Sequence, residues 1–370
     1  MSSGDTAAAS VDACNVFCNA SGSAVLARGR RLLALAGAAR GRNSTDEART
    51  LALRAAADLE AGVRLSRQAT EPSAVRCRAL LDLAEARAVA AGDTGAPGVL
   101  DALEQAVEAL PDGGPDQRGP DQRGPDQRGP DLRVQALRRL AEAHSARYRH
   151  TAETTELDAA DRVFAQAQTL VDLDDPLRAQ LLVGRGEVLV ARAERGGGLA
   201  DATDAARVLR RALALTPRSD PRLAERQLLF GQALHRHHAA GGAPTDLHEA
   251  EWVLASAARG TAVERTAALA WLERGDVSVK LADRTGAPEW LDTAAESYHR
   301  AARSADRAGE PLLAARSHHQ RGVVLERTAG PERALASYRE AWALWQRAQA
   351  AQGPLARSTF ERMRALGGTG

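Results

Sequence analysis

Aromatic residues, lysine and catalytic glycine motifs are scarce in this chain of 370 residues. Aromatic residues make up 3% of the sequence, and Lys280 is the one lysine among 49 basic residues. Because Lys280 stands between Val279 and Leu281, the sequence holds no GxxxxGK[ST] loop for nucleotide phosphates. GxSxG, a dinucleotide-binding glycine fingerprint and CxxC are missing too. We therefore predict no enzyme, with no catalytic residues and no cofactor.

Cysteine and long apolar runs are also rare. Cys14, Cys18 and Cys77 are too few and too unevenly spaced for a disulfide framework, so we expect free thiols in a reducing compartment. Cys14 and Cys18 share a face at i, i+4, but a metal site would need a second pair. The longest apolar run, 32–39, is far shorter than the ~20 residues of a membrane helix. Residues 1–20 lack the pattern of a secretory signal. These features predict a soluble, cytoplasmic chain with no membrane partner.

Net charge is small. A formal charge of +1 and a pI near 7.9 give no long-range field, and no basic patch is interleaved with aromatic residues. We therefore expect no nucleic-acid partner.

Alanine, leucine, arginine and glutamate dominate the composition, which favours helices over sheet. The segment 176–217 shows the pattern most clearly. Pro176 suits a first helical turn, apolar residues recur every three to four positions, and three glycines (196–198) interrupt them before a second periodic run. Two helices joined by so short a loop should pack antiparallel. The segment predicts one helical hairpin.

The hairpin recurs along the chain. A small anchor residue in the first helix is followed, nineteen residues later, by an alanine, a large residue and a second alanine in the second helix. In the last copy the interval is twelve residues. The anchors are separated by 45, 45, 44 and 47 residues; they are Ala141, Gly186, Gly231, Gly275 and Gly322. Four near-equal intervals indicate a repeat protein.

These positions resemble the tetratricopeptide repeat (TPR), which places a small residue in its first helix and alanine, a large residue and alanine in its second. Gly322, Ala334, Tyr338 and Ala341 match the standard spacing. The longer copies, of about 44 residues, are similar to the actinobacterial variety found with CHAT or NTPase signalling domains. The resemblance covers residues 130–350 well and 24–110 loosely, and no such signalling domain is recognisable in this chain. It implies bacterial signalling or defence.

The expected fold is all-α: a right-handed α-solenoid of about seven antiparallel, TPR-like hairpins. Five segments are predicted. They are a disordered or loose segment (1–22), degenerate repeats (23–111), a GPDQR low-complexity loop (112–132), C-terminal repeats (133–350), and a capping helix with a tail (351–370). In the loop segment, glycine and proline every fifth residue argue against both helix and sheet.

A row of polar residues follows the anchors. In the TPR register, the residue after each anchor faces the concave groove, and these residues are mostly acidic. The predicted partner-binding residues are Glu85, Glu142, Glu187, Gln232 and Asp276, with Val323 in the last copy. A row of uncompensated carboxylates favours a basic protein or peptide partner. The alternative is a solvated face whose acids pair with arginines such as Arg78, Arg138 and Arg185.

Histidines cluster at His235, His237, His238 and His248. His235 and His238 share a helix face at i, i+3, as two metal ligands would, but no cysteine or carboxylate set completes the shell. We therefore predict surface histidines near a helix end and no metal. This pair is also the only candidate for an enzymatic role.

The sequence as a whole predicts a non-enzymatic scaffold or adaptor that binds a protein or peptide in its groove. The alternative is a regulatory TPR protein that senses a peptide or small molecule by changing shape.

Overall fold

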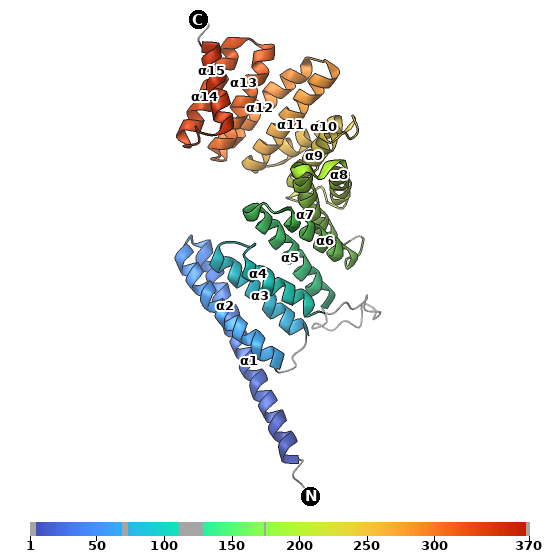
Figure 1. The fold of residues 1–370 in the computed structure, drawn as a ribbon, viewed down its shortest axis with the longest axis vertical. Helices are drawn as coiled ribbons and strands as arrows, with labels where there is room; N and C mark the ends of the chain where they lie inside the picture. The colour runs from blue at the N-terminus through green and yellow to red at the C-terminus, as the bar shows by residue number, and fades with distance from the viewer. Residues whose placement is uncertain (1–4, 69–72, 111–128, 174, 368–370) are drawn as a thin grey trace. The chain divides into compact units, whose positions relative to one another are not determined.

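The computed structural model describes residues 5–68, 73–110, 129–173 and 175–367. Every regular element within these ranges is helical, which confirms the predicted all-α fold (Figure 1). The helices of the first three hairpins are α1 (Asp5–Gly41), α2 (Thr45–Gln68), α3 (Ser73–Ala91), α4 (Pro97–Glu108), α5 (Gly129–Thr151) and α6 (Thr154–Thr169). The fourth hairpin is α7 (Pro176–Arg192), the π-helical segment η2 (Ala193–Gly197) and α8 (Gly198–Ala214).

Three further hairpins and a single last helix complete the chain. They are α9 (Leu223–Ala239) with α10 (Asp246–Gly260), α11 (Glu264–Thr285) with α12 (Glu289–Arg307), α13 (Pro311–Thr328) with α14 (Pro331–Arg347), and finally α15 (Pro354–Gly367). The predicted hairpin at 176–217 ends its first helix at the glycines as expected. Gly196 has φ of 102° and Gly198 of 70°, conformations that favour residues without a Cβ.

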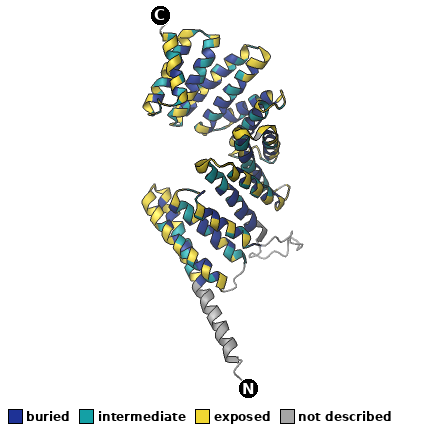
Figure 2. Ribbon diagram, viewed as in Figure 1, coloured by how far each residue is buried: buried dark blue, intermediate teal, exposed yellow. Residues whose placement is uncertain are grey.

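The chain divides into two compact units, Met1–Val188 and Leu189–Gly370, with the boundary inside α7. In each unit, consecutive helices pack against one another, and first helices also touch the first helix of the next repeat. These repeat-to-repeat contacts join α1 to α3 and α3 to α5 in the first unit, and α9 to α11 and α11 to α13 in the second. Stacking of this kind lets each hairpin bury residues that it could not bury alone. Figure 2 shows buried residues on the helices of both units.

In three hairpins, a glycine of the first helix packs directly against a large side chain of the second helix, and this contact sets how the two helices align. A Cβ on Gly275 would lie 2.5 Å from Tyr298, and one on Gly322 would lie 2.6 Å from Tyr338. Gly231 stands in the same relation to Leu254, at 2.5 Å. These three pairs confirm three of the five predicted anchors. In α7 the close contact is made by Gly184, which meets Phe164. The first hairpin has a reciprocal version, in which Gly29 meets Leu59 and Gly62 meets Leu26.

Two predicted segment boundaries are wrong. The segment 1–22 was expected to be disordered or loose, yet α1 begins at Asp5. The GPDQR loop was expected to extend to 132, yet α5 begins at Gly129, inside the last pentapeptide. Proline is compatible with a first helical turn because the backbone N–H there has no partner within the helix. Residues 111–128, and the side chains of Cys14 and Cys18, lie outside the described part of the chain.

Replacing Gly322 with alanine should lower the free energy of unfolding by about 1–2 kcal/mol. The added methyl group must displace the fully buried Tyr338 ring, which costs more than the ~1 kcal/mol that alanine gains over glycine in a helix. Chemical denaturation checks this. Gly37→Ala is the matched control, because nothing lies within 4 Å of its added Cβ. Equal stability changes in the two variants would contradict the packing argument.

His319 should make stability depend on pH. Its Nδ1 lies 2.8 Å from Thr359 Oγ1 of α15, and both residues are buried. Burial, helped by the positive charge of Arg362, lowers the pKa of His319 from 6.5 to about 4. Between those values the unfolded chain binds the extra proton, so the unfolding free energy falls as pH drops through this window.

We expect the stability difference between wild type and His319→Asn to shrink by roughly 2 kcal/mol from pH 7 to pH 5, since one pKa unit corresponds to about 1.4 kcal/mol. Urea unfolding of both proteins at each pH measures it. A difference that is constant across this range would show that His319 is not the titrating group.

Candidate functional site

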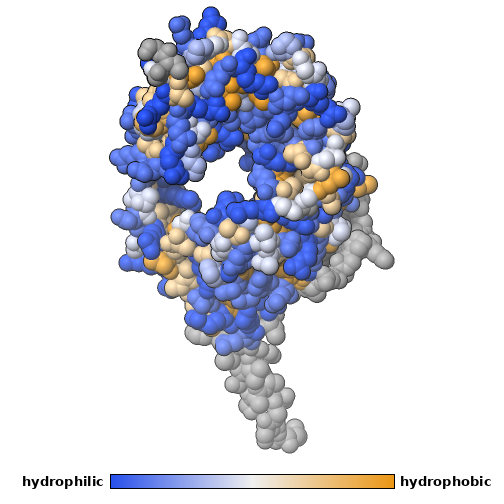
Figure 3. All heavy atoms as spheres, turned by 45° about the horizontal axis from the view of Figure 1, so that its top comes forward, coloured by the Kyte–Doolittle hydropathy of each residue, from blue (hydrophilic) through white to orange (hydrophobic). Residues whose placement is uncertain are grey.

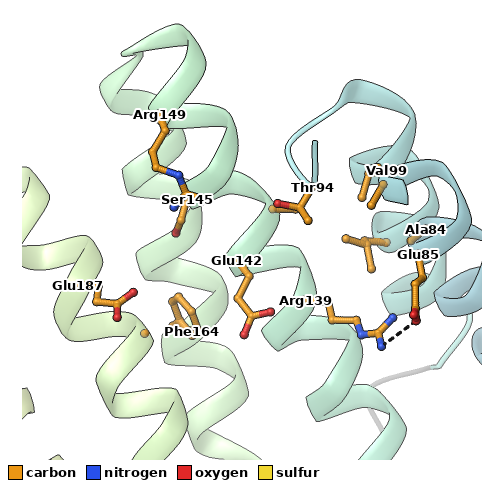
Figure 4. A pocket seen from close by; sticks show the side chains of 14 residues that line it. Ala84, Glu85, Thr94, Val99, Arg139, Glu142, Ser145, Arg149, Phe164 and Glu187 are labelled. Carbon is orange, nitrogen blue, oxygen red and sulfur yellow. Dashed lines mark hydrogen bonds and ion pairs between the residues drawn. The ribbon is translucent and has the colours of Figure 1, made fainter. Parts of the chain in front are cut away.

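A cavity of about 340 Å³ lies in the first unit, between the first helices of three successive hairpins. Figure 4 shows its walls: α3 contributes Glu85, α5 contributes Glu142, and α7 contributes Glu187. The turn before α4 closes one side with Thr94, and Phe164 of α6 lies between Glu142 and Glu187. Three of the five predicted groove residues thus line one site.

The repeat explains why these three glutamates converge. Each follows a buried small residue, Ala84, Ala141 or Gly186, that faces the packed side of its helix. The next residue is turned by about 100° around a helix of 3.6 residues per turn, so it leaves the packed interface. All three glutamates are exposed. Because the hairpins repeat, the three carboxylates fall on equivalent faces of neighbouring helices.

Two of the carboxylates have arginine partners. Arg139 Nη2 lies 3.3 Å from Glu85 Oε2, across the cavity wall, and Arg138 Nη1 donates to Glu142 Oε1 at 2.8 Å. The side chains of Glu85 and Glu142 are each half exposed, so such pairs contribute only about 0–1 kcal/mol. The predicted pairing of groove acids with arginines is therefore seen at Arg138. Arg185 instead pairs with Asp161 at 2.6 Å.

The floor of the cavity is apolar. Phe164 is 2% exposed, and its ring tip lies against Gly184, where a Cβ would come within 2.5 Å of Cζ. Ala88, Val99 and Leu103 continue this surface. Apolar walls reduce the screening of nearby charges by water, so a cation placed between the carboxylates would be attracted more strongly than on an open helix face.

Sequence reasoning missed the residues that complete the site. Ser145 and Arg149 line the cavity above Glu142 on the same helix, and Arg149 points toward Ser145 (Figure 4). Ser145 Oγ donates a hydrogen bond to the Ala141 carbonyl at 3.0 Å. The spacing of Glu142, Ser145 and Arg149 at i, i+3 and i+7 was a readable signal that they share one face of the helix.

Gln232 and Asp276, the other two predicted groove residues, belong to the second unit. Gln232 is half-buried. Asp276 accepts a hydrogen bond from the Tyr298 hydroxyl at 2.7 Å and lies 3.5 Å from Arg316. Burial, with the neighbouring charge of Glu273, raises the pKa of Asp276 despite the hydrogen bond from Tyr298. Asp276 thus belongs to a polar network between helices.

His235 was predicted to lie at the surface, and that prediction is wrong. His235 is 7% exposed, and its Nδ1 lies 2.6 Å from Glu273 Oε1. Burial favours the neutral form of Glu273, but the hydrogen bond and the charges of His235 and neighbouring arginines hold the pKa of Glu273 below its usual value. His235 is buried because α11 supplies this carboxylate, a long-range contact that helix spacing does not reveal.

The other histidines have separate neighbours. His237 pairs with Asp246 at 2.8 Å, and His248 packs edge-on against Trp290, with 6.0 Å between ring centroids. Among the described residues, no three His, Cys, Asp or Glu side chains are placed to hold a metal ion. Cys77 is buried and unpaired, and burial raises the pKa of its thiol to about 11.

The surface is largely polar. Figure 3 shows hydrophilic residues over most of the visible face, with apolar residues in small separate groups. In the part of the chain that the structure describes, no helix has both the length and the apolar character to cross a bilayer.

No protein-family model matches the sequence, and no curated protein sequence matches it significantly. Solved structures do resemble the fold. A STAND signal transduction ATPase with a tetratricopeptide repeat sensor, from Pyrococcus horikoshii, aligns over 86% of this chain with 13% identity and a TM-score of 0.50. The alignment covers 49% of that protein, so this chain spans about half its length.

Two other structures align at lower scores. A tetratricopeptide repeat protein from Parabacteroides merdae aligns over 92% of this chain and 98% of its own, with 12% identity and a TM-score of 0.47. A Rap protein complexed with competence and sporulation factor aligns over 94% and 98%, with 13% identity and a TM-score of 0.37. Identities this low bear on fold alone. Together with the glycine registers, the comparison shows that the chain has a tetratricopeptide-like helical-repeat fold.

Proposed function

We propose that this chain is a non-enzymatic scaffold or adaptor that binds a protein or peptide, and that the cavity of the first unit receives a basic side chain of that partner. The observation that carries the proposal is the convergence of Glu85, Glu142 and Glu187 on one cavity with an apolar floor. A volume of about 340 Å³ accommodates one or two side chains, at the small end of the ~300–1,000 Å³ range of ligand sites.

The charged residues that line the cavity determine which kind of partner side chain it can bind. Three carboxylates line the cavity against the guanidinium groups of Arg139 and Arg149. Glu85 and Glu142 are paired with Arg139 and Arg138, but both pairs are half exposed and contribute only about 0–1 kcal/mol each, so a basic group of a partner can exchange with them. Glu142 and Glu187 lie on either side of Phe164 (Figure 4). A lysine or arginine side chain can place its aliphatic part on the apolar floor and its charge between these carboxylates. An acidic side chain would be repelled there.

The proposal also includes where the protein acts and in which process. A cytoplasmic location, the absence of a nucleic-acid partner and a role in bacterial signalling or defence rest on the sequence and its resemblance. Within the second unit, taken by itself, Gln232 and Asp276 are proposed as further partner-binding residues.

The alternative function is a sensor that changes shape when a peptide or small molecule binds. The tetratricopeptide repeats of the Pyrococcus horikoshii protein are described as a sensor. Small-angle scattering separates the two functions, because a sensor changes its radius of gyration when ligand is added and a rigid adaptor does not.

Replacing two of the cavity carboxylates, as Glu142→Gln/Glu187→Gln, should weaken partner binding by up to roughly tenfold, since two exposed charge pairs contribute about 0–1 kcal/mol each. Affinity capture from a lysate of the source cells, followed by titration of the purified partner, measures this. The isosteric amides preserve shape, so lost affinity reports on charge.

The matched control is Glu104→Gln/Glu153→Gln, which removes the same charge from exposed positions outside the cavity. Wild type and control should bind alike, and both should weaken as salt rises. Equal affinity in all three proteins would move the site elsewhere. An empty wild-type capture would instead favour the small-ligand sensor.

A further inference from the structure

Charged side chains connect the first helices of three successive hairpins in the second unit. His235 Nδ1 of α9 lies 2.6 Å from Glu273 Oε1 of α11. Asp276, three positions further along α11, has its Oδ2 3.5 Å from Arg316 Nη2 of α13, and its Oδ1 accepts the Tyr298 hydroxyl of α12 at 2.7 Å. The network therefore has two junctions, one between α9 and α11 and the other between α11 and α13.

The two carboxylates of α11 are compensated unequally. Glu273 and its partner His235 are both buried and in direct contact, and the charge of Arg236 adds to this attraction. The Asp276 side chain is also mostly buried, at 19% exposure, but its cation Arg316 is half exposed and further away. Asp276 also shares a helix face with the negative charge of Glu273, because residues three apart are neighbours.

Burial and a nearby like charge both disfavour an ionised carboxylate. Asp276 is therefore the first carboxylate of this network to take up a proton as the pH falls. The pKa shifts follow the same order, since burial with the charge of Glu273 raises the pKa of Asp276, whereas the pKa of Glu273 is lowered.

Proton uptake by Asp276 affects the two junctions differently. A neutral Asp276 no longer attracts the guanidinium of Arg316, although its free oxygen can still accept the Tyr298 hydroxyl hydrogen. Glu273 remains ionised beside His235, without the repulsion of a second carboxylate. Only the junction between α11 and α13 loses an attraction.

We propose that Asp276 is a proton-sensitive joint of the second unit: uptake of one proton loosens the contact between α11 and α13 and leaves the contact between α9 and α11 intact. The charged and titratable groups that face Asp276 are Glu273 on its own helix, His235 of α9, Tyr298 of α12 and Arg316 of α13. This joint requires no ligand, so it does not depend on the proposed function.

The loosening is local and distinct from acid unfolding. Because the pKa of Asp276 is raised in the folded chain, the folded chain holds this proton more tightly than the unfolded chain does. The contribution of Asp276 to the free energy of unfolding therefore increases as the pH falls toward the ordinary value of 3.8.

Asp276→Asn imitates the protonated side chain at every pH and tests the joint in the whole chain. At pH 7.5, hydrogen–deuterium exchange of the α13 amides around Arg316 should be up to about fivefold faster in the variant than in wild type, which is the ceiling for a half-exposed ion pair. Exchange around His235 in α9 should be the same in both proteins. Lowering the pH toward 4 should shrink the difference in α13, with a midpoint above 3.8, because wild type then carries the proton as well.

Asp283→Asn is the matched control, since it neutralises another carboxylate of α11 that pairs with α13, through Arg327 at 2.8 Å. It should leave exchange around Arg316 unchanged. In an Arg316→Gln background, Asp276→Asn should have no further effect on α13. The inference fails if Asp276→Asn exchanges as wild type does at pH 7.5, if Asp283→Asn has the same effect around Arg316, or if the effect persists without Arg316. If Asp276→Asn does not fold, NMR titration of the wild-type carboxyl groups decides, and a midpoint for Asp276 at or below 3.8 overturns the inference.

Discussion

The close approach of a glycine backbone to a large side chain in the next helix is the contact on which the rest of this structure depends. Gly231 meets Leu254, Gly275 meets Tyr298, and Gly322 meets Tyr338, each with no room for a Cβ. This contact fixes the rotation of the first helix about its axis. Where the small anchor faces the packed side of its helix, the next residue is turned by about 100° away from it, as at Glu85, Glu142 and Glu187, which are exposed. The position of the candidate site therefore follows from a packing constraint.

Much of the fold was predictable because that constraint leaves a regular mark on the sequence. The helices from 133 to 350 and the glycine stop at 196–198 follow from periodic apolar residues and helix breakers, which are local signals. The starts of α1 and α5 were missed for the opposite reason. Residues 5–22 have no apolar stripe, and the last GPDLR copy is a loop sequence whose proline also suits a first helical turn.

The candidate site was predictable only in part, because a repeat places equivalent residues on equivalent faces but does not determine their partners. The convergence of Glu85, Glu142 and Glu187 follows from the register. The pairing of Arg139 with Glu85 joins residues 54 positions apart, and that of His235 with Glu273 joins residues 38 apart. No local spacing encodes such distances, and so His235 was expected at the surface and is buried.

Glu142 and Asp276 show that acidic residues at the same position of the repeat can have different surroundings. Glu142 and Asp276 both follow an anchor, yet Glu142 is half exposed beside a cavity, whereas Asp276 accepts a hydrogen bond from Tyr298, the residue that fills the space left by Gly275. The tyrosine hydroxyl recruits the carboxylate into the packing layer. Where the second helix offers Phe164, which has no hydroxyl, the equivalent acid stays available to solvent. The hydroxyl oxygen of the packing residue therefore accounts for the difference between an acid held by a hydrogen bond within the fold and one that is half exposed.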